Sequence, residues 1–336
     1  MKALVLENIS DMQIKDLPEP TVSGDEVKIK VKYSGICGTD KHLYLGLPGS
    51  ADAEMPVVLG HENSGEVVAV GPDVVDIKVG DRVAIDPNIY CGYCKYCRQG
   101  RPPQLCEHLS AVGVTRNGGL EEYTTAPQRV VYRLPDSVSY LSGAMVEPIS
   151  CVMHGIKRLN LEPAQKALVI GDGFIAQLFT QILAASGLSQ IDVSGHSDHK
   201  RELLGRCGAT HFYNNATEEV PTGYDVVIEC VGLPATQTAA VEQAGKGGQV
   251  LMFGVANPTD TFALNSYEVF QKELDIKGSF INPYVFEDSI ALLASGKVNV
   301  EMLISDEITL DQVADDLAGK FDHPINKAVV NIEKSL

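Results

Sequence analysis

Short runs in which hydrophobic and polar residues alternate make up much of the first half of the chain. Glycine separates these runs, which include GDEVKIKVKYSGIC, ENSGEVVAVG and VGDRVAI. Successive side chains of a β-strand point to opposite faces, so a period of two indicates a strand with one buried face. Short strands of this kind predict an antiparallel, barrel-like β domain.

Longer apolar strands alternate with helices from about residue 165 onward. KALVIGDGFIAQLFTQILAASG predicts a buried strand, a glycine turn and an apolar helix, and further strands are predicted at QIDVSG, HFYN, YDVVIEC, GQVLMFG and LDIKGSF. Helical stretches such as HKRELLGRCG and PATQTAAVEQAG lie between most of them. This order is typical of an α/β fold with a doubly wound parallel sheet. After about residue 281, VFEDSIALLASGK and LDQVADDLAGK predict two amphipathic helices.

The composition is that of a folded protein, and the net charge excludes some classes of binding partner. The 336 residues are 44% hydrophobic and 21% charged, and at roughly 150 residues per domain they make about two domains. The formal net charge of −17 would repel a nucleic-acid backbone or an anionic membrane surface, so we expect neither as a partner. No signal-peptide pattern and no run of 18 apolar residues occurs, so we expect a cytoplasmic protein.

Four of the eight cysteines fall within the loop CGYCKYCRQGRPPQLC. In a reducing compartment such a cluster more often holds a metal than disulfides. The spacing is C-x2-C-x2-C-x8-C, and it involves Cys91, Cys94, Cys97 and Cys106. Four thiolates close a tetrahedral shell around zinc and leave no open position, so we predict a structural zinc site.

A second set of candidate zinc ligands is spread over three segments, ICGTDKH, GHENSG and VEPISC. These segments supply one thiolate, one imidazole and two carboxylates, from Cys37, His61, Glu62 and Glu147. A mixed set of this kind suits a catalytic zinc with an exchangeable position. Beside Cys37, the Thr39 hydroxyl and the His42 imidazole could pass a proton to solvent.

The turn after the first strand of the second half reads G-x-G-x-x-A, from Gly171 to Ala176. With a strand before it and a helix after it, this pattern predicts a dinucleotide site. Gly171 permits the tight turn, and Gly173 lets a pyrophosphate approach the helix N-terminus, where Phe174 and Ile175 follow.

These motifs occur in one order along nearly the whole chain, which resembles the zinc-dependent medium-chain dehydrogenase/reductase family. VEPISCV is similar to the polyol dehydrogenase branch, which carries Glu where classical alcohol dehydrogenases carry a Cys ligand. GSFINPYVFEDSIALLASGKV is similar to bacterial sorbitol- and arabinitol-type dehydrogenases. The resemblance implies a chaperonin-like catalytic domain, a Rossmann domain and a C-terminal segment that returns to the catalytic domain. We place them at residues 1–149 (with a zinc lobe at about 88–108), 150–280 and 281–336.

The resemblance implies that Cys37, His61 and Glu62 hold a catalytic zinc, that Glu147 binds it directly or through a water, and that Asp40 orients a ligand imidazole. It further implies hydride transfer between a polyol and NAD(P), which gives the ketose, with Thr39 and His42 relaying the proton. Threonine and butanediol dehydrogenases share the Glu, so they stay alternatives. So does a non-catalytic, nucleotide-binding redox sensor. A homo-oligomer, tetramer or dimer, is expected.

Two positions depart from the family pattern. Pro102-Pro103 looks like an insertion in the four-cysteine loop. Animal sorbitol dehydrogenases carry an Arg after the Phe that corresponds to Phe280, whereas Ile281 and Asn282 follow it here. D-arabinitol or another sugar alcohol is therefore at least as good a substrate candidate as sorbitol.

The end of the second predicted strand bears on the choice of cofactor. NAD enzymes place an acid there to hold the ribose 2′-hydroxyl, and by alignment with the family Gly195 occupies that position. Nearby donors could bind a 2′-phosphate, although Asp198 in the same turn counts against it; the donors are His196, Ser197, Lys200 and Arg201. We therefore predict NADP over NAD. Structural roles are expected for the residues in apolar surroundings, Cys151, His154, Cys207 and Cys230.

Overall fold

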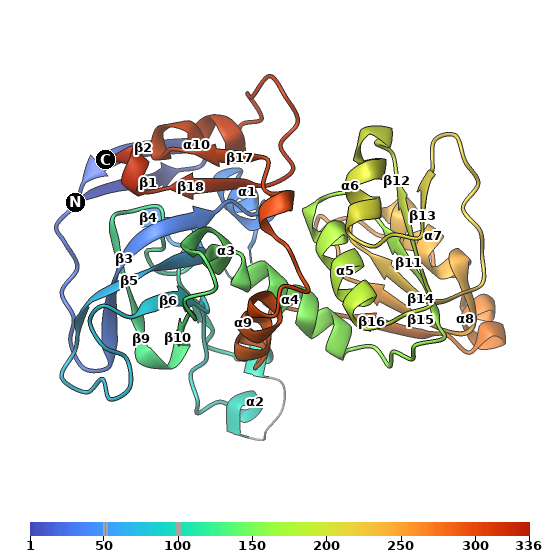
Figure 1. The fold of residues 1–336 in the computed structure, drawn as a ribbon, viewed down its shortest axis with the longest axis horizontal. Coiled ribbons are helices and arrows are strands. Elements are labelled where there is room, and N and C mark those ends of the chain that lie inside the picture. Colours follow the sequence, from blue (N-terminus) through green and yellow to red (C-terminus); the bar gives the residue numbers. More distant parts are fainter. Residues whose placement is uncertain (50, 52, 99–102) are drawn as a thin grey trace. The chain divides into compact units, whose positions relative to one another are not determined.

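The computed structural model describes residues 1–49, 51, 53–98 and 103–336, which form two compact units (Figure 1). The chain builds most of the first unit, enters the second unit after Ser150, and returns to the first at Asn282. The first unit comprises Met1–Ser150, Asn282–Ser295 and Val300–Leu336, and the second comprises Cys151–Ile281 and Gly296–Asn299.

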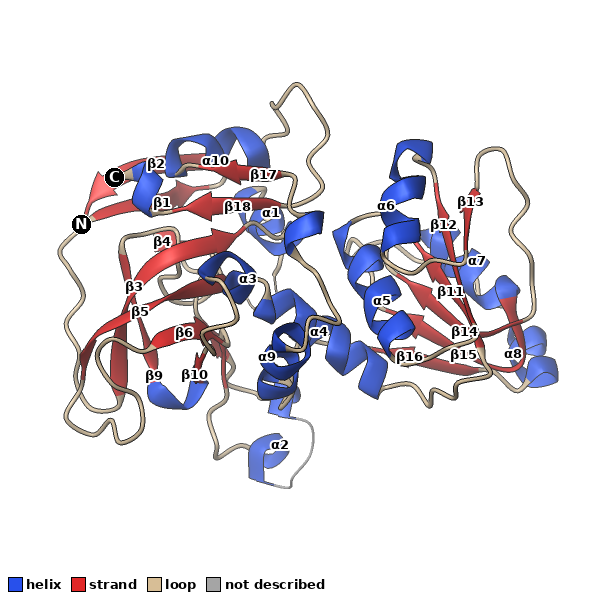
Figure 2. Ribbon diagram, in the orientation of Figure 1, coloured by secondary structure: helices blue, strands red, loops and turns tan. Residues whose placement is uncertain are grey.

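The first unit is built mainly from antiparallel strands (Figure 2). Its larger sheet has the order β10-β6-β5-β3-β18-β17, and β9 also pairs with β3. These strands are β3 (Glu26–Gly35), β5 (Glu62–Val70), β6 (Arg82–Ile85), β9 (Tyr123–Pro127), β10 (Val131–Arg133), β17 (Asp306–Ile308) and β18 (Ala328–Asn331). Among them β17 and β18 run parallel, and the other pairs are antiparallel. The predicted antiparallel β domain is confirmed, with this parallel pair as the exception.

Smaller elements complete this unit. A second sheet has the order β2-β1-β4, from Asp11–Asp16, Lys2–Asn8 and Val57–Val58. A two-stranded ladder joins β7 (Asn88–Ile89) and β8 (Ser110–Ala111). The helices are α1 (Gly38–Tyr44), α2 (Lys95–Arg98), α3 (Tyr140–Ala144), α9 (Phe286–Ala294) and α10 (Leu310–Leu317), and α4 (Val146–Lys157) continues from this unit into the second.

Strand β3 shows why the alternating pattern was readable in the sequence. Val27, Ile29 and Val31 are fully buried, while the lysines between them are only partly buried. Irregular register on either side of Ile29 and Val31 bends the strand as it pairs with β5.

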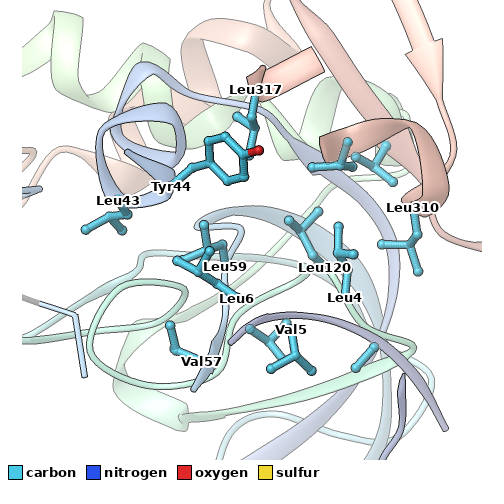
Figure 3. Packing of buried hydrophobic residues seen from close by; sticks show 14 of the residues in the cluster. Leu4, Val5, Leu6, Leu43, Tyr44, Val57, Leu59, Leu120, Leu310 and Leu317 are labelled. Carbon is cyan, nitrogen blue, oxygen red and sulfur yellow. The ribbon is translucent and has the colours of Figure 1, made fainter. Parts of the chain in front are cut away.

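The C-terminal segment packs against the start of the chain (Figure 3). Leu310 and Leu317 of α10 belong to the same buried cluster as Leu4 and Leu6 of β1 and Leu43 of α1. Burial of these side chains away from water holds the two ends of the chain in one core.

The second unit is a parallel sheet with the order β13-β12-β11-β14-β15-β16. The strands are β11 (Lys166–Ile170), β12 (Gln190–Gly195), β13 (His211–Asn214), β14 (Tyr224–Glu229), β15 (Ala244–Met252) and β16 (Asp275–Gly278). Helices α5 (Phe174–Ala185) and α6 (Arg201–Arg206) lie on one face, and α7 (Pro234–Gln243) and α8 (Ser266–Lys272) lie on the other (Figure 2). The predicted doubly wound parallel sheet is confirmed. No helix in the described part of the chain is both long and apolar enough to cross a membrane.

Candidate active site and metal centres

Cys37, His61 and Glu62 come together beside the pairing of β3 with β5. Gly35 of β3 lies opposite Glu62 of β5, so Cys37, which follows β3 by two residues, is brought near the start of β5. The Cys37 thiol, a His61 ring nitrogen and a Glu62 carboxylate oxygen lie within 4.8 Å of one another. Three of the four residues expected at the catalytic zinc are thus neighbours.

Gly35 makes room for the Glu62 carboxylate. A Cβ atom at position 35 would overlap Glu62 Oε2 and would lie 2.7 Å from Met145 Cε. Because Glu62 is 1% exposed, its carboxylate cannot turn toward solvent to make room for that atom. The glycine at the end of β3 is therefore a spatial requirement of the site.

Asp40 ties the start of α1 to the segment that carries His61. Its carboxylate is fully buried and accepts hydrogen bonds from Cys37 N (2.8 Å) and Gly60 N (3.3 Å). Asp40 Oδ1 also lies 3.4 Å from Nδ1 of His61. Burial alone would lower the pKa of His61, but the charges of Asp40 and Cys37 outweigh it and raise that pKa well above its usual value. The position of Asp40 against Nδ1 leaves Nε2 as the nitrogen for a metal.

Lys327 brings a buried positive charge to Glu62. Its Nζ lies 2.7 Å from Glu62 Oε1 and 2.6 Å from Oε2, and it also donates to Ile36 O at 2.8 Å. Burial disfavours the charged form, but Glu62 and Cys37 more than offset this and raise the pKa of Lys327. A buried carboxylate without such a partner is costly, so Lys327 offsets that cost for Glu62 and fixes its orientation.

Glu147 and the two expected relay residues are not part of this group. Glu147 is buried in the first turn of α4, and its carboxylate is not among the atoms within 4.8 Å of one another. Thr39 and His42 are partly buried and lie three residues apart on α1, so they share one side of that helix. The roles of all three residues stay predictions.

The four clustered cysteines also converge. Their sulfur atoms lie within 4.8 Å of one another, with 3.5 Å between Cys94 Sγ and Cys97 Sγ. Backbone amides point at the sulfurs: those of Cys91 and His108 donate to Cys106 Sγ, each at 3.4 Å. Short helical pieces at Lys95–Arg98 and Pro103–Leu105 lie within the loop. Of the suspected insertion, Pro103 begins the second piece, and Pro102 lies outside the described residues.

The chemistry of this cluster fits a cation. The backbone amides of Cys97 and Glu107 lower the pKa of Cys94 to about 6, which favours a thiolate. Desolvation instead raises the pKa of Cys97 to about 12. Four thiols this close together cannot all ionise unless a positive charge lies between them, and zinc supplies it with tetrahedral geometry.

The glycine turn of the second unit has the shape expected of a dinucleotide site. Gly171 has φ of +124°, a conformation that side-chain-bearing residues rarely adopt, and Gly173 is the N-cap of α5. Phe174 and Ile175 open the helix, but the Phe174 side chain is buried and therefore packs into the unit. The backbone amides at the N-terminus of this helix are the groups that can face a pyrophosphate.

Asp172, between the two glycines, contacts the end of β12. Its Oδ2 accepts hydrogen bonds from His196 N (2.9 Å) and Ser197 N (3.0 Å). Its Oδ1 lies 3.7 Å from Lys200 Nζ. Three of the residues expected to bind a 2′-phosphate therefore already face a carboxylate.

Arg201, the fourth expected phosphate ligand, is paired with other groups. Its guanidinium lies 3.0 Å from Asp198 Oδ1 and 2.9 Å from Glu218 Oε1, and it donates to Phe212 O at 2.7 Å. Asp198, which the sequence analysis counted against phosphate binding, therefore pairs with one of the expected phosphate ligands.

Comparison with known proteins agrees with this arrangement. Residues 23–136 match the alcohol dehydrogenase GroES-like domain, and residues 175–295 match the zinc-binding dehydrogenase domain. The sorbitol dehydrogenase of Bacillus subtilis is 35% identical over 94% of this chain and 92% of its own length. The D-arabinitol dehydrogenase 1 of Uromyces fabae is 31% identical over 91% and 89%.

A solved structure gives the same result. A protein described as a zinc-binding dehydrogenase from Sinorhizobium meliloti 1021, bound to NADP, superposes with a TM-score of 0.94. It is 32% identical, over 98% of this chain and 99% of that one. This chain belongs to the zinc-dependent medium-chain dehydrogenase family. The family resemblance in the sequence is confirmed, and the dehydrogenase is an oxidoreductase.

Sequence reasoning missed two functional residues of this dehydrogenase, Lys327 and Asp172. Lys327 lies in the unremarkable run HPINKAVV, 265 residues from Glu62, and no local pattern points to it. The sequence did contain a signal for Asp172, because an acid between the two glycines of the turn places a charge where a dinucleotide would pass.

The cysteines and the histidine that were expected to be structural lie in the second unit. Burial raises the pKa of Cys207 to about 11 and raises that of Cys230 well above its usual value. Burial also lowers the pKa of His154 to about 4. All three groups are therefore neutral near pH 7, as structural residues in apolar surroundings would be; Cys151 is partly buried on α4.

Proposed function

We propose that this dehydrogenase oxidises a secondary hydroxyl of a polyol, such as D-arabinitol or sorbitol, to the ketose and transfers the hydride to NAD(P). The observation that carries the proposal is the group of Cys37, His61 and Glu62, in a chain related over most of its length to sorbitol and D-arabinitol dehydrogenases. A thiolate, an imidazole and a carboxylate leave a fourth position of a tetrahedral zinc open to substrate.

Each residue of the candidate active site has a separate role in this reaction. Cys37, His61 and Glu62 would hold the catalytic zinc, which when bound supplies a Lewis acid that makes the substrate hydroxyl more acidic. Asp40 keeps the His61 ring in one orientation, and Lys327 does the same for the Glu62 carboxylate. Thr39 and His42 carry the released proton toward solvent.

Glu147 supports the choice of a polyol over a simple alcohol. It stands where classical alcohol dehydrogenases carry a Cys ligand, so the site gains a carboxylate that can accept hydrogen bonds from neighbouring hydroxyls. In this proposal Glu147 binds the zinc directly or through a water, and Glu62 is the carboxylate grouped with the thiol and the imidazole.

Two zinc ions per chain follow from the two groups of ligands, one catalytic and one in the four-cysteine loop. For the dinucleotide, the turn at Gly171 supports NAD(P). The preference for NADP over NAD stays a prediction that rests on Gly195 and the basic residues after it. The cytoplasmic location also stays a prediction.

A homo-oligomer, tetramer or dimer, completes the proposal. Strand β16 lies at one edge of the parallel sheet and pairs only with β15 among the described strands. Helix α8, which contacts β15, exposes Tyr267 and the Phe270 side chain, which is 80% exposed. An edge strand and exposed apolar side chains on the same unit favour a second copy. Phe270→Asp should lower the molar mass measured by light scattering.

The deciding experiment compares zinc content with turnover. Metal analysis should give close to two zinc ions for the wild type and one for both Cys37→Ser and Cys94→Ser. Cys37→Ser should abolish polyol turnover while the fold is kept, whereas Cys94→Ser should lower the melting temperature first, because the loop owes its order to the metal. One zinc in the wild type would contradict the structural site.

The substrate is tested with pentitols, hexitols, threonine, 2,3-butanediol and ethanol, compared by kcat/KM with each cofactor. Pentitols or hexitols should exceed ethanol by at least tenfold. Threonine or butanediol as the best substrate would favour those alternatives. Zinc binding with no turnover of any alcohol would favour the redox sensor.

A further inference from the structure

The Asp172 carboxylate occupies the space in which an acid at the end of β12 would stand. Asp172 is 6% exposed, and its side chain spans from the glycine turn after β11 to the turn after β12. A Cβ atom built on Gly195 would lie 2.5 Å from Asp172 Cβ and 2.6 Å from its Oδ2. Position 195 therefore cannot carry a side chain unless Asp172 moves.

In doubly wound NAD enzymes, the acid after the second strand binds the ribose hydroxyls. Here the strand ends in Gly195, but the neighbouring turn supplies a carboxylate to the same place. Both hydrogen bonds from the turn after β12 end on Oδ2 of Asp172, and Oδ1 faces Lys200 at 3.7 Å. A carboxylate has about four lone-pair sites, so it can hold these amides and still accept from a hydroxyl.

The charges around Asp172 do not favour an additional phosphate. Lys200 faces Asp172, and Arg201 is shared between Asp198 and Glu218. These two cations meet three carboxylates, so the local balance is one negative charge before any cofactor binds. A 2′-phosphate would bring up to two more.

We propose that Asp172 is the residue that discriminates against the 2′-phosphate of NADP in this dehydrogenase. The proposal rests on the proposed function, because it takes the Gly171 turn to be the NAD(P) site. Asp172 accepts the ribose hydroxyl of NAD and repels the phosphate of NADP. It thus opposes the preference expected from Gly195, since that expectation counted a missing carboxylate at 195 and not the one at 172.

The test is the affinity of the zinc-loaded protein for NAD⁺ and for NADP⁺, measured by isothermal titration calorimetry without polyol. Asp172→Asn keeps the oxygen that accepts the two amides and removes the charge. We expect the ratio of the NADP⁺ association constant to the NAD⁺ association constant to rise about tenfold or more. The rise should shrink as the ionic strength increases.

Lys200→Gln provides the opposite perturbation. It removes the cation that faces Asp172, so the same ratio should fall by about tenfold. Asp225→Asn is the matched control, because Asp225 also accepts a backbone amide, from Lys166 at 2.8 Å, but at the other end of the strands. It should change neither affinity by more than about twofold.

The outcomes distinguish a failure of the inference about Asp172 from a failure of the proposed function. If Asp172 only braced the turn, Asp172→Asn would weaken both cofactors equally and leave the ratio unchanged, which would overturn this inference. A ratio that falls in Asp172→Asn, or rises in Lys200→Gln, would overturn it as well. Failure of the wild type to bind either cofactor would instead overturn the dinucleotide site and with it the proposed function.

Discussion

Replacement of Glu121 tests how a buried charge limits the stability of the first unit. Glu121 is 2% exposed, and its Oε2 has no hydrogen-bonding partner among the described residues. Burial raises the pKa of this carboxyl to about 8, and the Met1 amino group and Thr124 offset that effect only in part. The folded protein therefore binds a proton on Glu121 more tightly than the unfolded chain, in which the pKa is near 4.5.

The size and the sign of the effect follow from these two values. Protonated Glu121 contributes its stability in full below pH 4.5, and the contribution is lost as the pH rises through 8. At about 1.4 kcal/mol per pKa unit, the loss is about 3 kcal/mol at pH 7 and about 5 kcal/mol at pH 9. Glu121→Gln cannot ionise, so it should exceed the wild type by these amounts. At pH 5 the difference should be within about 1 kcal/mol.

The assay is urea unfolding of the zinc-loaded protein at these three pH values. The chain has no tryptophan, so circular dichroism is combined with hydrogen exchange of peptides from β1 and β9, which report on the first unit. Glu219→Gln, at an exposed site in the second unit, is the control and should have no effect. A stability gain in Glu121→Gln that is the same at pH 5 and pH 9 would refute the reasoning.

Three further substitutions test the site and its support. Lys327→Met leaves the Glu62 carboxylate buried without its cation, so kcat/KM for the polyol should fall at least about tenfold and zinc should dissociate more readily, as metal analysis after dialysis would reveal. Gly195→Ala should weaken the binding of NAD⁺ more than that of NADP⁺, because its Cβ meets Asp172 and displaces the carboxylate, and calorimetry would detect it. Asn282→Leu removes three buried hydrogen bonds, so urea unfolding should show a loss of about 2 kcal/mol or more.

The sequence predicted a strand or helix wherever its hydrophobic residues recur with the period of that element. Val27, Ile29 and Val31 alternate with lysines along β3, so the burial of that strand could be read directly from the sequence. Helix α8 escaped prediction because none of its residues is buried, and Tyr267 and Phe270 point outward. With no buried face, α8 shows no period of 3.6 residues.

The candidate site was predictable only in part, because its ligands have local motifs and their supporting residues do not. Cys37 and His61 stand in segments that are distinctive by themselves. Lys327 becomes significant only when β18 pairs with β3 and carries the segment just before it to the site. Glu121 and Glu122 are adjacent acids, and the sequence gives no reason why the first is buried while the second binds the N-terminus.

Gly35 and Gly195 share a feature that the sequence alone does not reveal. Each is a glycine at the end of a strand, and each lies where a side chain would collide with a carboxylate from another segment, Glu62 in one case and Asp172 in the other. A glycine at such a position was interpreted at 195 as the loss of an acid. Our proposal is the opposite interpretation, because the missing side chain leaves space that the Asp172 carboxylate fills. The charge of a site therefore depends on which carboxylate reaches the gap as well as on which residue borders it.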